Sequence, residues 1–274
     1  MSNQNNEEIK KIITSRKMKT NCFSFYNEIV DWIENNKADT YLIENNVFLF
    51  LKIHGFYKFY YFVNSFNDIS LCKELLEKYK TKSNISLEFT TKNEIYINEI
   101  TPVLKEIGFN FYKEYARVIS AFSPFKSEEE NISYEIASLE NKNELLEIMY
   151  REFDVISDYL PTEEEIINLI DNKSILIKTL DEKIVFIQIY EYSKGALYSR
   201  MTWIDKKYRK PKYTIDFYKS LDTYLKQLDI ENLEKIRSYG WIDKNNKNFK
   251  INLKFGAKLD GVTCTIFLYD EIKG

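Results

Sequence analysis

The spacing of hydrophobic residues predicts a mixed chain of helices and strands in two similar halves. In the first half, helical spacing covers residues 23–34, 70–80 and 95–107, although Pro102 is expected to open or break the third helix. Strand-like runs cover residues 40–44, 47–53, 56–64 and 85–90. The aromatic residues 108–122 predict a closing β-hairpin, and the polar first 20 residues predict a frayed or helical lead-in.

The second half repeats this order of elements. Strands are predicted at residues 132–137, 174–180, 183–192, 196–205 and 235–241, and a last hairpin extends to residue 270. Helices are predicted at residues 141–153, 162–171, 213–227 and 246–254. Thr162 and Glu165 have the spacing of a capping box at the start of the second helix. Each half reads as helix, three strands, helix, strand, helix, glycine and hairpin, which makes an internal repeat plausible.

The polar segment SPFKSEEEN at residues 123–131 is the best linker in the chain of 274 residues. We therefore predict two domains, residues 1–127 and 128–274. The expected fold class is α+β or mixed α/β, and each domain should hold a mixed, mostly antiparallel twisted sheet flanked by helices.

Composition narrows the classes of partner. The chain has 39 basic and 42 acidic residues and a formal charge of −3, so nucleic acid is not an expected partner. The longest apolar runs, such as residues 47–51, fall far short of the roughly 20 residues that span a bilayer. The N-terminus has no apolar core typical of a signal peptide. We expect a cytoplasmic protein without a membrane partner, either a monomer or a homodimer.

Several kinds of site are excluded by scarce residues. The three cysteines are widely spaced and predict free buried thiols, and His54 is the single histidine, so no zinc site is expected. No G-x-G occurs, which excludes the dinucleotide-binding fingerprint. The G-x4-G spacing between Gly256 and Gly261 is interpreted as a turn, because Val262 stands where a phosphate loop has lysine.

Two local segments carry candidate chemistry. The segment MTWIDKKYRKPKYTIDFYKSLDTYLKQ, which starts at Met201, reads as a strand, a basic loop and an amphipathic helix. This order suits a pyrophosphate, because the free N–H groups and the dipole of a helix N-terminus favour an anion. Positive charge is added there by Lys206, Lys207, Arg209, Lys210 and Lys212. The segment YGWIDKNNKNFKINLKFGAKLDG, which starts at Tyr239, reads as a strand, a turn with Asn245, and a helix ending near Gly256.

With the element order, these segments make residues 132–270 resemble the GNAT superfamily of acyl-CoA N-acyltransferases. The resemblance implies that acyl-CoA lies in an opening between the fourth and fifth strands, with its pyrophosphate at the following helix. The residues it assigns to acyl-CoA are Thr202, Trp203, Ile204, Lys207, Arg209, Lys210, Lys212, Tyr213, Thr214 and Asn245.

Within this resemblance, a backbone N–H near Thr202–Ile204 holds the oxyanion. Lys212 and Thr214 depart from the family's loop glycines, Asn252 stands at the position of its frequent tyrosine acid, and Ala257 replaces its usual phenylalanine.

A direct-transfer reaction also needs a base and an acid. Glu191, near the end of the third strand, is the predicted base, and Asp205 is the second candidate. Tyr239 is the predicted acid, with Tyr198 and Tyr213 as alternatives.

The first half resembles a degenerate GNAT-like repeat. Its loop at residues 64–70 has no arginine, lysine or glycine, and Asp68 would repel a pyrophosphate. We expect this half to bind no CoA and to supply packing surface or part of an acceptor pocket.

The resemblance predicts a tandem-domain N-acyltransferase that moves an acetyl or other acyl group from acyl-CoA, with acetyl-CoA as co-substrate and no metal. The acceptor is a primary amine on a small molecule or peptide. The alternative is a non-catalytic GNAT-like binding or regulatory protein. A transferase that uses aminoacyl-tRNA is disfavoured by the acidic charge.

Overall fold

The computed structural model describes residues 3–15, 17–121, 134–193, 195–209, 224–225, 236–254 and 256–269. The chain divides into two compact units, which we call the N-terminal unit (Met1–Tyr115 with Gly261–Gly274) and the C-terminal unit (Ala116–Asp260). The predicted domain boundary and linker fall in residues 122–133, which lie outside the described residues, so the boundary stays a prediction.

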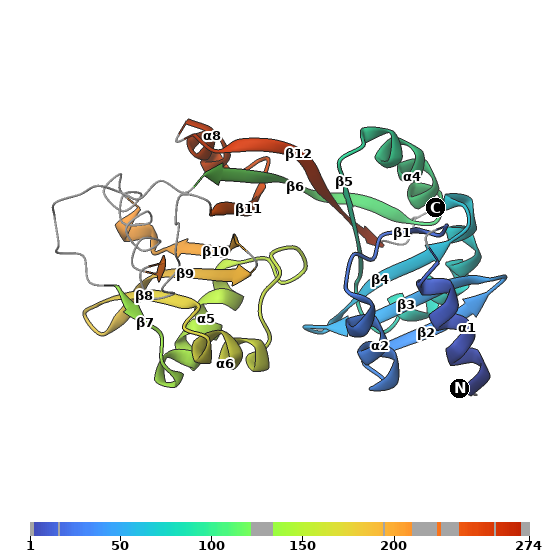
Figure 1. Cartoon of the computed structure of the whole chain (residues 1–274), viewed down its shortest axis with the longest axis horizontal. Helices are drawn as coiled ribbons and strands as arrows, with labels where there is room; N and C mark the ends of the chain where they lie inside the picture. The colour runs from blue at the N-terminus through green and yellow to red at the C-terminus, as the bar shows by residue number, and fades with distance from the viewer. Residues whose placement is uncertain are drawn as a thin grey trace. The chain divides into compact units, whose positions relative to one another are not determined.

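The N-terminal unit is built on three consecutive antiparallel strands and a parallel neighbour. The strands are β2 (Ala38–Ile43), β3 (Asn46–Ile53), β4 (Phe56–Val63) and β5 (Ile85–Thr91), and the short β1 (Lys19–Thr20) lies beside β4 (Figure 1). The helices are α1 (Asn3–Ile13), α2 (Tyr26–Glu34), η1 (Phe66–Cys72), α3 (Lys73–Lys80) and α4 (Glu94–Glu106).

Both faces of this sheet are covered, which explains the continuous apolar runs of β3 and β4. Phe48, Phe50 and Phe59 belong to the core shared with α3 and α4. Leu49 and Phe62 belong to the core shared with α1 and α2. Burial on two sides therefore replaces the alternation that a half-exposed strand would show.

The C-terminal unit repeats this order. Its strands are β7 (Glu135–Ile136), β8 (Ile175–Leu180), β9 (Lys183–Ser193), β10 (Ala196–Ile204) and β11 (Arg237–Asp243). Its helices are η2 (Leu139–Asn141), α5 (Lys142–Glu152), α6 (Glu163–Asp171), η3 (Lys206–Tyr208) and α8 (Lys247–Lys254). Figure 1 shows α5 and α6 on one side of β8–β10, where Ile187, Met201 and Trp203 share their core. The predicted helix at residues 213–227 lies almost wholly outside the described residues.

Two long strands complete one mixed sheet, which has 12 strands within the described residues. They are β6 (Phe109–Ala121) and β12 (Lys258–Tyr269), and the strand order is β2-β3-β4-β5-β12-β6-β11-β10-β9-β8-β7, with β1 on β4. The mixed α+β class is thus confirmed. The β12 strand pairs with β5 from Thr263 to Leu268, so the end of the chain belongs to the N-terminal unit.

The two predicted hairpins are wrong, since β6 and β12 are single strands. Within residues 109–121 there is no Gly, Pro or Asp, and Asn110 is too close to the start to make a turn. In β12, Gly261 has a φ of +83° yet lies inside the strand rather than in a turn. An isolated glycine in a strand can mark an irregular position as well as a turn, and the sequence does not distinguish the two.

One helix prediction is corrected and another is confirmed. Pro102 lies inside α4 and does not break it, because Ile100 and Leu104 are fully buried and hold the helix on the sheet. The lead-in is a helix, as one prediction allowed, but it also contains β1, which the polar sequence did not indicate.

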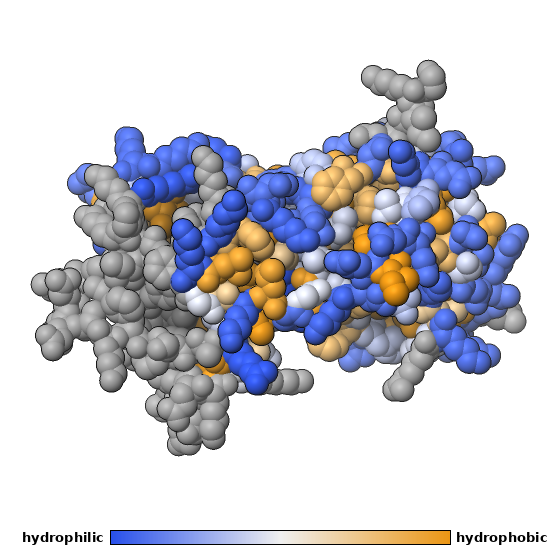
Figure 2. All heavy atoms as spheres, turned by 90° about the horizontal axis from the view of Figure 1, so that it is seen from above, coloured by the Kyte–Doolittle hydropathy of each residue, from blue (hydrophilic) through white to orange (hydrophobic). Residues whose placement is uncertain are grey.

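The surface visible in Figure 2 is mostly hydrophilic, with hydrophobic side chains interspersed among charged ones. Phe25 and Phe111 are among the large hydrophobic side chains that are exposed, and single exposed residues of this kind are common on soluble proteins. Among the described residues, no helix has the length and hydropathy needed to cross a membrane.

Candidate functional site

The C-terminal unit contains a parallel strand pair that stops short. Residues 196–199 of β10 pair with residues 237–240 of β11, and β10 then continues from Met201 to Ile204 in pairing with β9. A register shift between Ser199 and Met201 marks a β-bulge at this point. Beyond Ser199 and Gly240, β10 and β11 no longer pair with each other. We call this part of the sheet the β10–β11 opening.

Gly240 lies at the last pair before the opening. A Cβ atom added there would meet the carbonyl oxygen of Ser199 at 3.1 Å, closer than most real Cβ contacts. Glycine suits this position, because a side chain would press against the β10 backbone.

The bulge is fixed from one face by Gln188 of β9. This fully buried side chain donates from Nε2 to the Ser199 hydroxyl at 3.0 Å, and its Oε1 accepts from the Thr202 hydroxyl at 2.6 Å. Because Ser199 and Thr202 lie on either side of the bulge, one carboxamide holds both ends of the irregular stretch.

On the other face, three predicted candidates form a row across adjacent strands. Glu191 of β9 is opposite Tyr198 of β10, and Tyr198 is opposite Tyr239 of β11. The Tyr198 and Tyr239 rings stack with centroids 5.0 Å apart and an interplanar angle of 15°. The row therefore lies one residue before the β10–β11 opening.

The surroundings of Tyr239 keep its hydroxyl protonated. Burial raises the pKa of Tyr239, the nearby Glu191 carboxylate raises it further, and Arg117 of β6 opposes these effects. Arg117 also donates from Nε to Asp260 at 2.8 Å and lies 5.9 Å from the Trp241 ring centroid. The Tyr239 phenol is thus protonated at neutral pH.

Glu191 is held in an ion pair that the sequence did not predict. Its Oε1 lies 3.4 Å from Nη1 of Arg200, a residue of the bulge. Arg200 also donates to the Tyr159 carbonyl at 3.2 Å and lies 3.5 Å from Glu165 of α6. The guanidinium, with a side chain 13% exposed, ties the bulge to the loop between α5 and α6.

Arg200→Gln is expected to loosen this loop, residues 153–162. The change removes two ion pairs and a charge-assisted hydrogen bond, so the free energy of unfolding should fall by about 1–3 kcal/mol. Denaturant unfolding would measure this change, and hydrogen exchange should show faster exchange across the loop. Arg151→Gln, whose side chain is 52% exposed and pairs with Glu147 and Glu152 of its own helix α5, is the control. Unchanged exchange in the loop would contradict the role given to Arg200.

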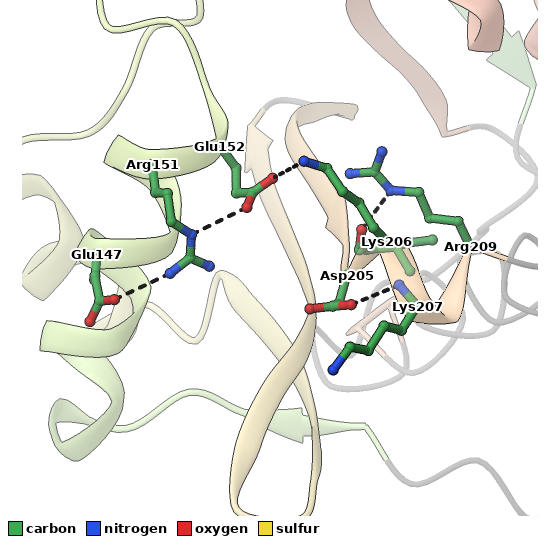
Figure 3. Close-up of polar contacts among 8 residues, drawn as sticks. Glu147, Arg151, Glu152, Asp205, Lys206, Lys207 and Arg209 are labelled. Atoms are coloured by element: carbon green, nitrogen blue, oxygen red, sulfur yellow. Dashed lines mark hydrogen bonds and ion pairs between the residues drawn. The ribbon is translucent and has the colours of Figure 1, made fainter.

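The basic loop after β10 begins with a short turn whose side chains bond to nearby backbone groups and to α5 (Figure 3). Asp205 accepts from the backbone N–H of Lys207 at 2.8 Å and so caps η3, an interaction that competes with its second-choice role as a base. Arg209 donates from Nε to the Ile204 carbonyl at 2.9 Å. Lys206 extends toward Glu152 of α5, with 4.0 Å between Nζ and Oε2.

The remaining residues predicted to bind acyl-CoA do not lie together in one described site. Trp203 is buried in the core under α5 and α6, so only its backbone remains for the predicted oxyanion role. Asn245 is exposed in the turn before α8, where its N–H donates to the Asp243 carboxylate at 2.8 Å. The predicted residues that lie outside the described residues are Lys210, Lys212, Tyr213 and Thr214. The cofactor-binding roles stay predictions.

Sequence reasoning missed Gln188, Arg200 and Arg117. Each interrupts an apolar or aromatic strand with a polar side chain, as in IVFIQIY, ALYSRMTWI and EYARVIS. A buried polar group requires a partner, so such interruptions are the signal that would have identified them.

Comparisons with solved structures give the fold a context. No protein-family model and no curated protein matches the chain. A GCN5-related N-acetyltransferase from Sphaerobacter thermophilus is similar, with a TM-score of 0.56, 9% identity, and 90% of this chain and 85% of that chain covered. A GCN5-related N-acetyltransferase from Kribbella flavida has a TM-score of 0.52 and 11% identity, covering 90% and 96%.

The third comparison concerns the doubled architecture. A tandem GNAT protein from the clavulanic acid biosynthesis pathway has a TM-score of 0.53 and 9% identity, covering 81% of this chain and 78% of that chain. Because the sequence identities are only 9–11%, these comparisons inform on the fold alone. The two similar series of elements, the parallel strands that part after a few pairs and these neighbours together show that the chain has the fold of the GNAT acetyltransferases, at low sequence identity.

Proposed function

We propose that the C-terminal unit transfers an acyl group from acyl-CoA, with acetyl-CoA as the first candidate, to a primary amine on a small molecule or peptide. The observation that carries the proposal is the β10–β11 opening: a parallel pair that ends at Ser199 and Gly240, beside a bulge, with a basic loop at the end of β10. The GNAT fold is consistent with this use of acetyl-CoA.

The reaction needs no metal or redox step. The amine loses a proton to a base and its nitrogen attacks the thioester carbonyl carbon, forming a C–N bond and a tetrahedral oxyanion. Collapse of this intermediate breaks the C–S bond, and the CoA thiolate takes a proton. The products are an amide and CoA.

Tyr239 is the proposed proton donor to the thiolate, since its phenol is protonated at neutral pH and lies one residue before the β10–β11 opening. Glu191 is the proposed base, acting directly or through a water molecule. Arg200 orients the Glu191 carboxylate, and Tyr198 lies between Glu191 and Tyr239 in the row. The proposed base and the proposed acid are thus separated by one strand, one residue before the β10–β11 opening.

The alternative is a binding protein that retains the fold without the chemistry. It is supported by the fact that both candidate bases already make other interactions. Glu191 forms an ion pair with Arg200, and Asp205 caps η3. The same experiment separates the two functions.

Calorimetric titration with acetyl-CoA and with CoA is expected to show binding to the full chain, and saturating ligand should raise the midpoint of thermal unfolding. At a hundredfold excess over the dissociation constant, the added stability is about 2.7 kcal/mol. Arg209→Ala should weaken binding at least tenfold, because a guanidinium near the pyrophosphate is lost.

The matched control is Arg151→Ala, which removes a half-exposed arginine of α5 and should leave the affinity unchanged. Equal loss in both variants would indicate a general charge effect. If saturating acetyl-CoA and CoA produce neither heat nor a shift, the acyltransferase proposal is rejected in favour of the binding protein.

A further inference from the structure

The N-terminal unit contains a second pair of parallel strands that parts. The strands β4 and β5 pair only at Tyr57–Ile85 and Lys58–Ser86. Beyond these pairs, β4 continues beside β3 as far as Phe62, and β5 continues beside β12 as far as Thr91. This β4–β5 opening follows three antiparallel strands, as the β10–β11 opening does.

A segment of the chain itself lies in the β4–β5 opening. Lys19 and Thr20, which form β1, pair antiparallel with Val63 and Phe62 of β4. Directly after β1, the Asn21 side chain reaches both separated strands. Its Nδ2 donates to the Phe59 carbonyl of β4 at 2.9 Å and to the Glu88 carbonyl of β5 at 3.1 Å.

The same side chain also accepts a hydrogen bond. The Tyr61 N–H donates to Oδ1 of Asn21 at 2.9 Å. Asn21 is 3% exposed, so its carboxamide provides buried backbone groups of both strands with partners that they would otherwise take from each other.

Contacts on either side of Asn21 hold the segment in place. Cys22 is buried in the core shared with α1 and α2, and its N–H donates to the Thr20 hydroxyl at 2.9 Å. The Lys19 ammonium lies 4.2 Å from the Phe66 ring centroid and 3.8 Å from a Glu99 oxygen. The segment at residues 19–22 is thus a built part of the sheet.

We infer that residues 19–22 fill the β4–β5 opening, where a second acyl-CoA would otherwise bind. The chain would then bind one acyl-CoA rather than two. In the GNAT resemblance, acyl-CoA lies between the corresponding strands. The pantetheine arm of CoA carries amides, and the Asn21 carboxamide presents the same donor and acceptor to the strands. With Asn21 in place, these backbone groups of β4 and β5 are already bonded.

This inference has two parts. The closure of the N-terminal unit stands on its own contacts, whereas the count of one acyl-CoA rests on the function proposed for the C-terminal unit. The experiment therefore has a structural arm and a binding arm.

The structural arm is native-state hydrogen exchange of the full chain. The Tyr61 amide should exchange as slowly as amides of the central strand β3, because its acceptor is a buried side chain. Asn21→Ala should speed exchange at Tyr61 at least tenfold, with amides of β9 unchanged. Asn110→Ala, at an exposed position of β6, is the control. A Tyr61 amide that exchanges freely in the wild-type protein would overturn the closure.

The binding arm is calorimetric titration of the wild-type chain with acetyl-CoA. A stoichiometry of one per chain, unchanged in Asn110→Ala, is expected. A stoichiometry of two would overturn the inference. No binding at all would reject the proposed acyltransferase function and the stoichiometry of one acyl-CoA per chain. Slow exchange at Tyr61 would still support the closure of the β4–β5 opening by residues 19–22. The wild-type measurements decide both arms even if Asn21→Ala fails to fold.

Discussion

Lys58→Met is expected to lower the free energy of unfolding by about 3–5 kcal/mol, because it leaves the Glu88 carboxylate charged and buried without its counter-ion. Lys58 Nζ lies 2.7 Å from Oε1 of Glu88, and both side chains are only 9% exposed. Urea unfolding of the two proteins at pH 7 would measure the difference.

A surface pair of the same length gives the matched control. Lys37 and Asp31 are also 2.7 Å apart, but their side chains are 57% and 45% exposed, so Lys37→Met should cost less than about 1 kcal/mol. The double variant Lys58→Met, Glu88→Leu should recover most of the loss, since neither charge remains to be desolvated. Equal costs for Lys58→Met and Lys37→Met would contradict the argument.

The buried pair also has a defined pH dependence. Burial is the largest single influence on the pKa of Lys58 and lowers it, but the Glu88 carboxylate and the neighbouring Tyr60 together raise the pKa above its ordinary value. A raised lysine pKa stabilises the fold below the unfolded-state pKa of about 10.4, and this contribution is lost as the pH rises through the folded-state value. The pair therefore stabilises the protein across neutral pH.

Asn21→Ala is expected to lower the free energy of unfolding by about 3 kcal/mol or more. The change leaves two carbonyls and one N–H without their buried partner, and each such group costs about 1–3 kcal/mol. Asn21→Asp should cost still more at neutral pH, because a carboxylate would face the carbonyl oxygens of Phe59 and Glu88. Thermal and urea unfolding would measure both variants.

The two variants should differ in their response to pH. The carbonyls would raise the pKa of the new carboxyl group, so the deficit of Asn21→Asp should grow as the pH rises above about 4, whereas that of Asn21→Ala should stay constant. Asn110→Ala should change stability by less than about 0.5 kcal/mol. A pH-independent deficit in Asn21→Asp would show that its side chain has moved out to solvent.

Local signals in the sequence predicted most elements of the fold. The capping box is one case: the Thr162 N–H donates to Glu165 at 2.8 Å, and the Glu165 N–H donates to the Thr162 hydroxyl at 3.2 Å. The meander strands β3 and β4 also lie within a residue of their predicted bounds. Both depend on interactions close in sequence, where spacing alone carries the information.

The site required information that local spacing does not contain. The sequence identified Glu191, Tyr198 and Tyr239 as separate candidates, but only the register of three strands shows that they form a row. Asn21 gave no signal because it follows a polar segment, and its three partners are 38, 40 and 67 residues away. Long-range strand pairing decides both features.

The placement of β12 has a consequence for synthesis of the chain. Phe267 and Tyr269 belong to the same core as Phe48 and Phe109, and Tyr269 lies 5.3 Å from Phe109 between ring centroids. On the ribosome, the N-terminal unit therefore lacks one of its strands until residues 261–269 emerge. Its β5 edge stays open during the translation of the whole C-terminal unit, a period in which an unpaired strand edge is prone to wrong pairing.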